Sequence, residues 1–133
     1  MNMLDSNTRL LVRKSLDYLW QKQRVTAENI ANAETPGYKA KHLTFEDELR
    51  RNIMNANRNF KGPAPSIRRK IENAINSTNI NTHKTDNQTS RLDGNNVNID
   101  VENVELARTQ LQYQTLIEFL LRDQRMRTVI DGR

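Results

Sequence analysis

Histidine is the side chain that most often does acid–base chemistry or binds a transition metal near neutral pH, and this chain has two, His42 and His83. A long polar stretch separates them, neither has carboxylates at ligand spacing, and the chain contains no cysteine. No Ser/His/Asp arrangement, glycine-rich phosphate loop or paired carboxylate on a helix face stands out. We therefore expect no enzymatic activity, no metal site and no cofactor.

The other chemistry that the composition allows is electrostatic binding by basic side chains. The net charge of +5 is concentrated in residues 49–91, where nine Lys/Arg stand against Glu72 and Asp86. Such a segment can bind phosphate backbones non-specifically, but its cations are scattered, have almost no interleaved aromatics and match no nucleic-acid motif. We expect it to lie on an acidic neighbour or to stay solvated. Nucleic-acid binding is the less favoured alternative.

The apolar content is low for a chain that must fold alone. Of 133 residues, 35% are hydrophobic and 5% aromatic, and the mean hydropathy is −0.86. A large share of the burial should therefore come from neighbouring molecules. No apolar run approaches the roughly 20 residues of a membrane span, and the first residues do not resemble a cleaved signal peptide.

Residues 1–46 should form an N-terminal helix over about 5–32, followed by a turn and an extended stretch over 38–45. Asp5 or Ser6 can cap the start of the helix. Apolar residues recur at alternating steps of three and four, which is typical of a coiled-coil seam, and further apolar positions lie off that seam. The residues expected to pack are Val12, Leu16, Leu19 and Ile30.

The end of this helix is marked by Thr35-Pro36-Gly37-Tyr38. Proline disfavours a helical conformation at the preceding residue, and Pro-Gly fits the centre of a type II turn, in which glycine supplies the positive φ. Asn32 can adopt the left-handed conformation at the helix end. These residues predict a sharp stop and a reversal of the chain.

Residues 47–92 form a basic segment with few apolar side chains, which we interpret as flexible or ordered only by a partner. A short helix over about 67–75 is consistent with the spacing of its isoleucines. Residues 93–133 then begin with a turn and continue as a helix over about 101–130, for which Asp100 is the expected N-cap. This helix is apolar nearly all round, and the residues expected to pack are Val104, Leu111, Tyr113, Ile117 and Leu120. The predicted fold is mostly α, with two long terminal helices in a coiled-coil-like pair.

Two motifs within these elements resemble the flagellar rod and hook protein family. In that family a long helix ends in A-N-x-x-T-P-G-Y, and every fixed position is present here, preceded by Asn29-Ile30. The matching residues are Ala31, Asn32, Thr35, Pro36, Gly37 and Tyr38. Short proximal members carry a D-G-N-x-V-x-x-D turn before the last helix, matched here by Asp93, Gly94, Asn95, Val97 and Asp100. The resemblance covers about residues 5–46 and 92–130.

This resemblance implies a structural subunit of the proximal rod without cofactor or catalysis. It implies export through the flagellar type III apparatus without signal cleavage, and assembly in the periplasm, where terminal helices of many subunits pack into a hollow shaft. The implied partners are copies of the chain, other rod subunits, and the membrane-ring adaptor and export-gate proteins at the rod base. Nucleic acid and a direct membrane span are not implied.

Three points remain open from the residues alone. Asn29 and Asn32 share a face and either cap the helix in solvent or bond the backbone of a neighbouring subunit. Tyr38 either completes the turn or also packs on an adjacent subunit. A stand-alone coiled-coil adaptor or scaffold is the main alternative to a rod subunit. It predicts a stable, highly helical dimer, whereas a rod subunit should be poorly helical until it polymerises.

Overall fold

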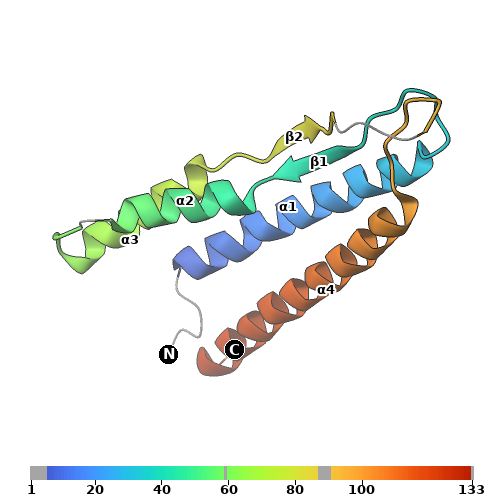
Figure 1. Ribbon diagram of the computed structural model, residues 1–133. Helices are drawn as coiled ribbons and strands as arrows, with labels where there is room; N and C mark the ends of the chain where they lie inside the picture. Colours follow the sequence, from blue (N-terminus) through green and yellow to red (C-terminus); the bar gives the residue numbers. More distant parts are fainter. Residues whose placement is uncertain (1–5, 59, 87–90, 133) are drawn as a thin grey trace.

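The computed structural model describes residues 6–58, 60–86 and 91–132, and Figure 1 shows how its elements are arranged. In chain order these elements are α1 (Ser6–Ala31), β1 (Lys41–Thr44), α2 (Glu46–Asn57), α3 (Ala64–Ser77), β2 (Asn81–Lys84) and α4 (Ile99–Ile130). Of the helices in this part of the chain, none has the length and apolarity needed to cross a membrane.

The two terminal helices dominate the fold and lie side by side in opposite directions (Figure 1). Their 26 and 32 residues correspond to about 39 and 48 Å at ~1.5 Å per residue. Lys22 on α1 pairs with Glu105 on α4 at 3.4 Å. The predicted mostly helical fold with a long terminal pair is confirmed, and the structure adds the antiparallel direction, which the sequence left open.

The core that holds these elements together is small. Tyr18, Leu19 and Phe45 form one cluster, in which the Tyr18 and Phe45 rings stack with centroids 4.9 Å apart. Tyr113 and Leu116 of α4 cover this cluster from one side. A second cluster joins Ala33, Ala40 and Val97 near the far end of α1. Many apolar side chains of α4 are left outside both clusters.

The central segment differs from the flexible or partner-ordered stretch that we expected. Its described residues form α2 and α3, which pack together as a helical hairpin, and β2, which pairs antiparallel with β1. Ile75 is 1% exposed, and Ile80 packs against the Tyr18 cluster. The predicted helix over 67–75 lies inside the longer α3. Pairing between β1 and β2 is a contact between segments about forty residues apart, and local apolar content does not reveal such a contact.

The start of α4 corrects a second expectation. Asn98 rather than Asp100 is the N-cap, because its Oδ1 accepts hydrogen bonds from the backbone N–H groups of Asp100 and Val101 at 3.2 and 3.3 Å. Asp100 lies in the first turn, where its negative charge stabilises the positive end of the helix dipole. At the start of α1, Asp5 lies outside the described residues, and Ser6 is the first helical residue.

Candidate assembly interface

The predicted stop after α1 is present as a tight turn. The Tyr38 N–H donates to the Thr35 carbonyl at 3.2 Å, which closes the turn around Pro36 and Gly37. Gly37 has φ +73°, a conformation that side chains with a Cβ adopt only at a cost. Pro36 and Ala31 are exposed to solvent. The motif therefore forces the chain to reverse direction and run back along α1 as β1.

A second turn, before α4, docks directly on the first. The Gly37 N–H donates to the Asp93 carbonyl at 2.7 Å, and the Lys39 ammonium donates to the Gly94 carbonyl at 2.6 Å. Gly94 has φ +76°, and a Cβ on it would lie 3.7 Å from the Gly37 Cα. We call this contact, formed by residues 29–41 and 91–98, the turn junction. It ties the end of α1 to the start of α4.

Asn95 is the fully buried centre of the turn junction, with 0% exposure. Its amide nitrogen donates to the carbonyls of Asn32 and Thr35 at 2.9 and 2.8 Å, so it holds the turn that follows α1 at two points. Its Oδ1 accepts from the Val97 N–H at 2.8 Å, and its own N–H donates to Asp93 at 3.0 Å. An asparagine supplies the donors and the acceptor that this position uses.

Asn29 plays the corresponding part on α1 and is 1% exposed. Its amide nitrogen donates to the Lys41 carbonyl at 2.7 Å and to Glu102 at 3.2 Å. Its Oδ1 accepts from the Lys41 N–H at 2.9 Å and from the Tyr38 hydroxyl at 3.0 Å. Burial, together with the nearby Glu28 carboxylate, raises the pKa of Tyr38, which keeps this hydroxyl a donor. One side chain thus joins α1, β1, the turn and α4.

Within the single chain, both asparagines have intramolecular partners, and bonds from them to a neighbouring subunit stay a prediction for the assembly. Asn29 uses both of its donors and its acceptor within its own chain. Asn32 is a helix-end cap, since its side chain donates to the Glu28 carbonyl at 2.8 Å and accepts from the Thr35 hydroxyl at 3.1 Å. Tyr38 completes the junction and lies against the Ala33 cluster.

Charged and polar side chains that the sequence did not single out brace the turn junction. Arg91 donates to the Ala33 carbonyl at 2.8 Å and pairs with Asp93 at 3.1 Å. Lys41 pairs with Glu28 at 2.7 Å, and this hydrogen bond raises the pKa of the Lys41 ammonium. Asn96 accepts from the Ala40 N–H at 2.7 Å. No local pattern marks these residues, because each has at least one partner in another segment of the chain.

The predicted packing residues divide into an inner and an outer set. On α1, Val12 and Leu19 are buried and the other two are half-buried. On α4 the half-buried residues are Tyr113, Ile117 and Leu120. Val104 and Leu111 are 60% and 67% exposed, so the described part of the chain leaves most of their surface uncovered. Their packing remains a prediction for the assembly.

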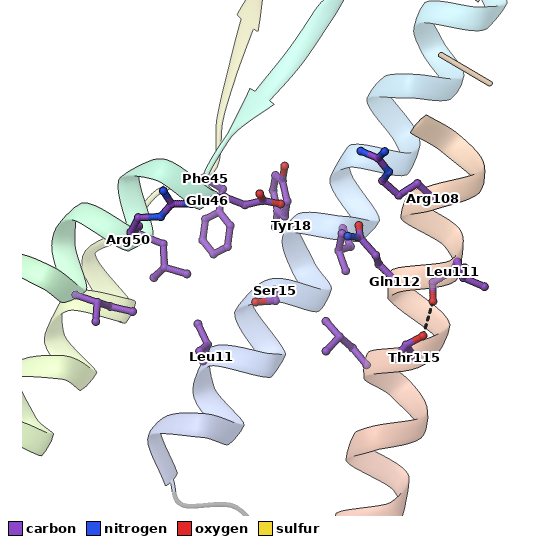
Figure 2. A pocket seen from close by; sticks show the side chains of 14 residues that line it. Leu11, Ser15, Tyr18, Phe45, Glu46, Arg50, Arg108, Leu111, Gln112 and Thr115 are labelled. Carbon is purple, nitrogen blue, oxygen red and sulfur yellow. Dashed lines mark hydrogen bonds between the residues drawn. The ribbon is translucent and has the colours of Figure 1, made fainter. Parts of the chain in front are cut away.

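An apolar groove opens between α2 and α4 over one face of α1, as Figure 2 shows. Leu11 and Ser15 of α1 form its floor, and side chains of α2 and α4 form its two walls. The groove has a volume of about 530 Å³. Its walls include Leu49, Ile53, Leu111 and Leu116. It is a hollow of the size and apolarity that accepts a large side chain or part of a helix.

The histidines and one acidic residue behave differently from what their sequence context indicated. His42 and His83 are direct partners across the β1–β2 pair, with ring centroids 5.9 Å apart. Within the described ranges no group of three or more His, Cys, Asp or Glu is placed to hold a metal ion. Asp123 is 5% exposed, unusually low for a carboxylate, and pairs with Arg127 at 3.3 Å.

An antiparallel helix pair, locked by a polar junction at one end and apolar on its outer faces, defines a structural subunit made for helical packing. A family model described as flagella basal body rod protein matches residues 19–39, the second half of α1 and the turn. The chain is similar to flagellar basal body rod protein FlgB of Bacillus subtilis (strain 168), with 32% identity over 97 residues, 73% of this chain and 71% of the relative.

Two other relatives cover slightly more of the chain. FlgB of Salmonella typhimurium (strain LT2) is 32% identical over 106 residues, 77% of this chain and 76% of the relative. FlgB of Escherichia coli (strain K12) is 30% identical over 112 residues, 81% of this chain and 80% of the relative. The chain belongs to the FlgB family of flagellar basal body rod proteins. It is a non-enzymatic structural subunit of the proximal rod and assembles with other rod proteins.

Proposed function

We propose that the chain builds the rod through the outer faces of its terminal helices, which pack against copies of itself and other rod subunits to form the wall of a hollow shaft. The observation that carries this proposal is the apolar outer face of α4. Large apolar side chains along its whole length are 41–75% exposed, among them Val101, Val104, Leu111, Met126 and Val129. Large apolar side chains exposed in this number along one helix indicate a protein–protein contact surface.

The turn junction has a mechanical part in this proposal. Hydrogen bonds and ion pairs hold α1 and α4 at a fixed angle, so force applied to one helix passes to the other without bending the chain. A shaft that connects the membrane ring and export gate to the distal rod and transmits torque needs subunits that are rigid in this way. We assign this role to the junction's motif residues, which comprise both turns.

The three segments of the chain have different roles in this proposal. Residues 1–46 and 93–133 supply the packing helices and the junction, and residues 47–92 supply the α2–α3 hairpin. The exposed cations of that hairpin, including Arg51, Arg58 and Arg69, suit an acidic surface of the membrane-ring adaptor or the export gate at the rod base. Export through the type III apparatus without signal cleavage, and assembly in the periplasm, complete the proposal.

A charged residue on the outer face of α4 tests the packing role. Val104→Asp places a charge where the proposal puts a dry contact, so we expect loss of incorporation into basal bodies and loss of motility in a strain lacking its own copy. Gln114→Asp adds the same charge at an exposed polar position of the same helix and should leave both intact. Normal rods with Val104→Asp contradict the proposal. A stable, highly helical dimer of the purified chain favours the adaptor alternative instead.

A further inference from the structure

Trp20 is the single tryptophan of the chain, and it lies uncovered on α1 with 52% of its surface exposed. The Arg24 guanidinium lies over its ring at 5.7 Å from the centroid. Asp17, one turn before it on the same face, is also exposed. Tryptophan is enriched among residues that dominate the affinity of protein contacts. An exposed indole between two opposite charges is therefore a candidate contact residue, and we call Trp20 with Asp17 and Arg24 the knob.

The apolar groove between α2 and α4 is the candidate site for this side chain, and we call it the hole. It is floored by Leu11 and Ser15 and is large enough for an indole. Its charged lining residues are Glu46 and Arg50 on the α2 side and Arg108 on the α4 side. These charges complement those beside the knob, since Arg24 can pair with Glu46 and Asp17 with Arg50, while Arg108 already pairs with Glu105 at 3.2 Å.

Knob and hole lie on opposite sides of the same helix. Leu11 and Trp20 are nine residues apart, which at ~3.6 residues per turn is two and a half turns, so their side chains point in opposite directions. A copy that inserts its knob into the hole of a neighbour still has its own hole free for a third copy. Such a contact is heterologous, and repetition of it gives a ring or a helical array rather than a closed dimer.

We propose that Trp20 of one copy of this chain inserts into the apolar groove between α2 and α4 of a second copy, with Arg24 facing Glu46 across the contact. The inference rests on the proposed function, because it names the lateral partner of the packing helices. It assigns the groove one occupant, a second copy of this chain, and predicts the direction of assembly. Because each copy has the knob on one side of α1 and the hole on the other, the same contact can be repeated from copy to copy around the shaft.

Cross-linking between engineered cysteines in isolated basal bodies tests this contact, and the chain has no native cysteine to interfere. In the double variant Arg24→Cys/Glu46→Cys, a short bis-maleimide should join copies into a ladder of dimers, trimers and larger species. Cells that contain Arg24→Cys and Glu46→Cys on separate copies should give dimers only. The matched pair Arg24→Cys/Arg69→Cys, with the second thiol on the exposed face of α3, should give no ladder.

Each other outcome counts against the proposal. Assembled rods without the 24–46 cross-link overturn it while leaving the rod role intact, whereas failure of every variant, controls included, to enter the rod counts against the proposed function. Dimers from Arg24→Cys alone show a symmetric knob-to-knob contact and also overturn it.

If a variant pair does not enter the rod, the same contact is tested in solution with the purified chain. There the emission of Trp20 should shift to the blue as concentration rises, and Ser15→Phe, which fills the groove, should weaken association at least tenfold. Mixing Ser15→Phe with Trp20→Ala should restore a one-to-one dimer, because one variant keeps the knob and the other keeps the hole. Association without a shift in the emission of Trp20, or a mixture no more associated than its components, contradicts the inference.

Discussion

Replacing Asn29 by alanine removes the amide that connects α1, β1, the turn and α4 at one point. The substitution leaves the Lys41 N–H and carbonyl, the Tyr38 hydroxyl and one Glu102 oxygen without the partner that each now has. The side chain is 1% exposed, so the vacated space lies inside the junction. The neighbouring Asn32 offers a matched comparison, because its side chain bonds at the rim of the same junction.

The loss of stability in Asn29→Ala depends on which of these groups can hydrogen-bond to water after the substitution. A buried polar group left without a partner costs about 1–3 kcal/mol. The two backbone groups of Lys41 lose an interior partner, whereas the half-buried Tyr38 and Glu102 side chains can turn to solvent. We therefore expect the free energy of unfolding to fall by about 2–4 kcal/mol for Asn29→Ala, against about 1 kcal/mol for the cap variant Asn32→Ala.

Urea titration followed by far-ultraviolet circular dichroism measures this difference. The titration is run in trimethylamine N-oxide, which favours the buried state of a chain with a small core. With a slope of ~1–3 kcal/mol per molar urea, Asn29→Ala should lower the midpoint by about 1 M or more, clearly beyond Asn32→Ala. Equal midpoints for the two variants would refute the reasoning that the Asn29 amide is the centre of the junction.

Three further predictions concern the turn, the helix pair and the response to alkali. Gly37→Val should destabilise the chain by about 1–2 kcal/mol and reduce swimming in soft agar, because φ is +73° at this position; unchanged motility contradicts it. In trimethylamine N-oxide, Leu120→Asp should lower the helicity of the purified chain as well as block incorporation, since Leu120 faces α1, whereas Val104→Asp should affect incorporation alone; equal helicity loss in the two would refute this division. Burial, with Glu46 and Glu105 nearby, raises the pKa of Tyr18 to about 12 from 10.0. The unfolded chain therefore ionises first, and stability should fall by about 2 kcal/mol as pH rises from 10 to 12, a loss that Tyr18→Phe should lack in alkaline unfolding curves.

The sequence predicted the parts of the fold that depend on local spacing. The two long helices follow from the recurrence of apolar residues every three or four positions, and the stop after α1 follows from Pro36 and Gly37, whose backbone preferences are intrinsic. The predicted start of α4 lies two residues after the observed one. Asn98 and Asp100 are both good caps, and only the position of the first helical turn distinguishes them.

Contacts between distant segments were beyond sequence reasoning. β1 alternates between half-buried and exposed residues and lies in the predicted extended stretch, but its partner Asn81–Lys84 is exposed throughout and has no alternation that would predict a strand. The role of Asn29 could be narrowed to a polar contact at the helix end, but its partners at Lys41 and Glu102 are fixed only by the folded chain. Asp123 is buried because α1 covers that face of α4. The sequence of a helix that is apolar nearly all round does not show which face its partner helix covers.

That choice also explains the division of the α4 packing residues. A helix that is apolar nearly all round can present several faces to a single partner helix, and its sequence does not rank them. In the folded chain α1 covers the face with Tyr113 and Leu120, leaving the face with Val104 and Leu111 for other molecules. The surplus of apolar faces over in-chain partners is the main physical reason to regard the chain as part of an assembly.

Amide hydrogen exchange along α4, compared between the free chain and isolated basal bodies, tests this claim most directly. If α4 completes its burial only against neighbours, its amides should exchange readily in the dilute free chain and be strongly protected in the rod. Protection in the free chain that already equals that in the rod, and that does not change with concentration, would contradict the account.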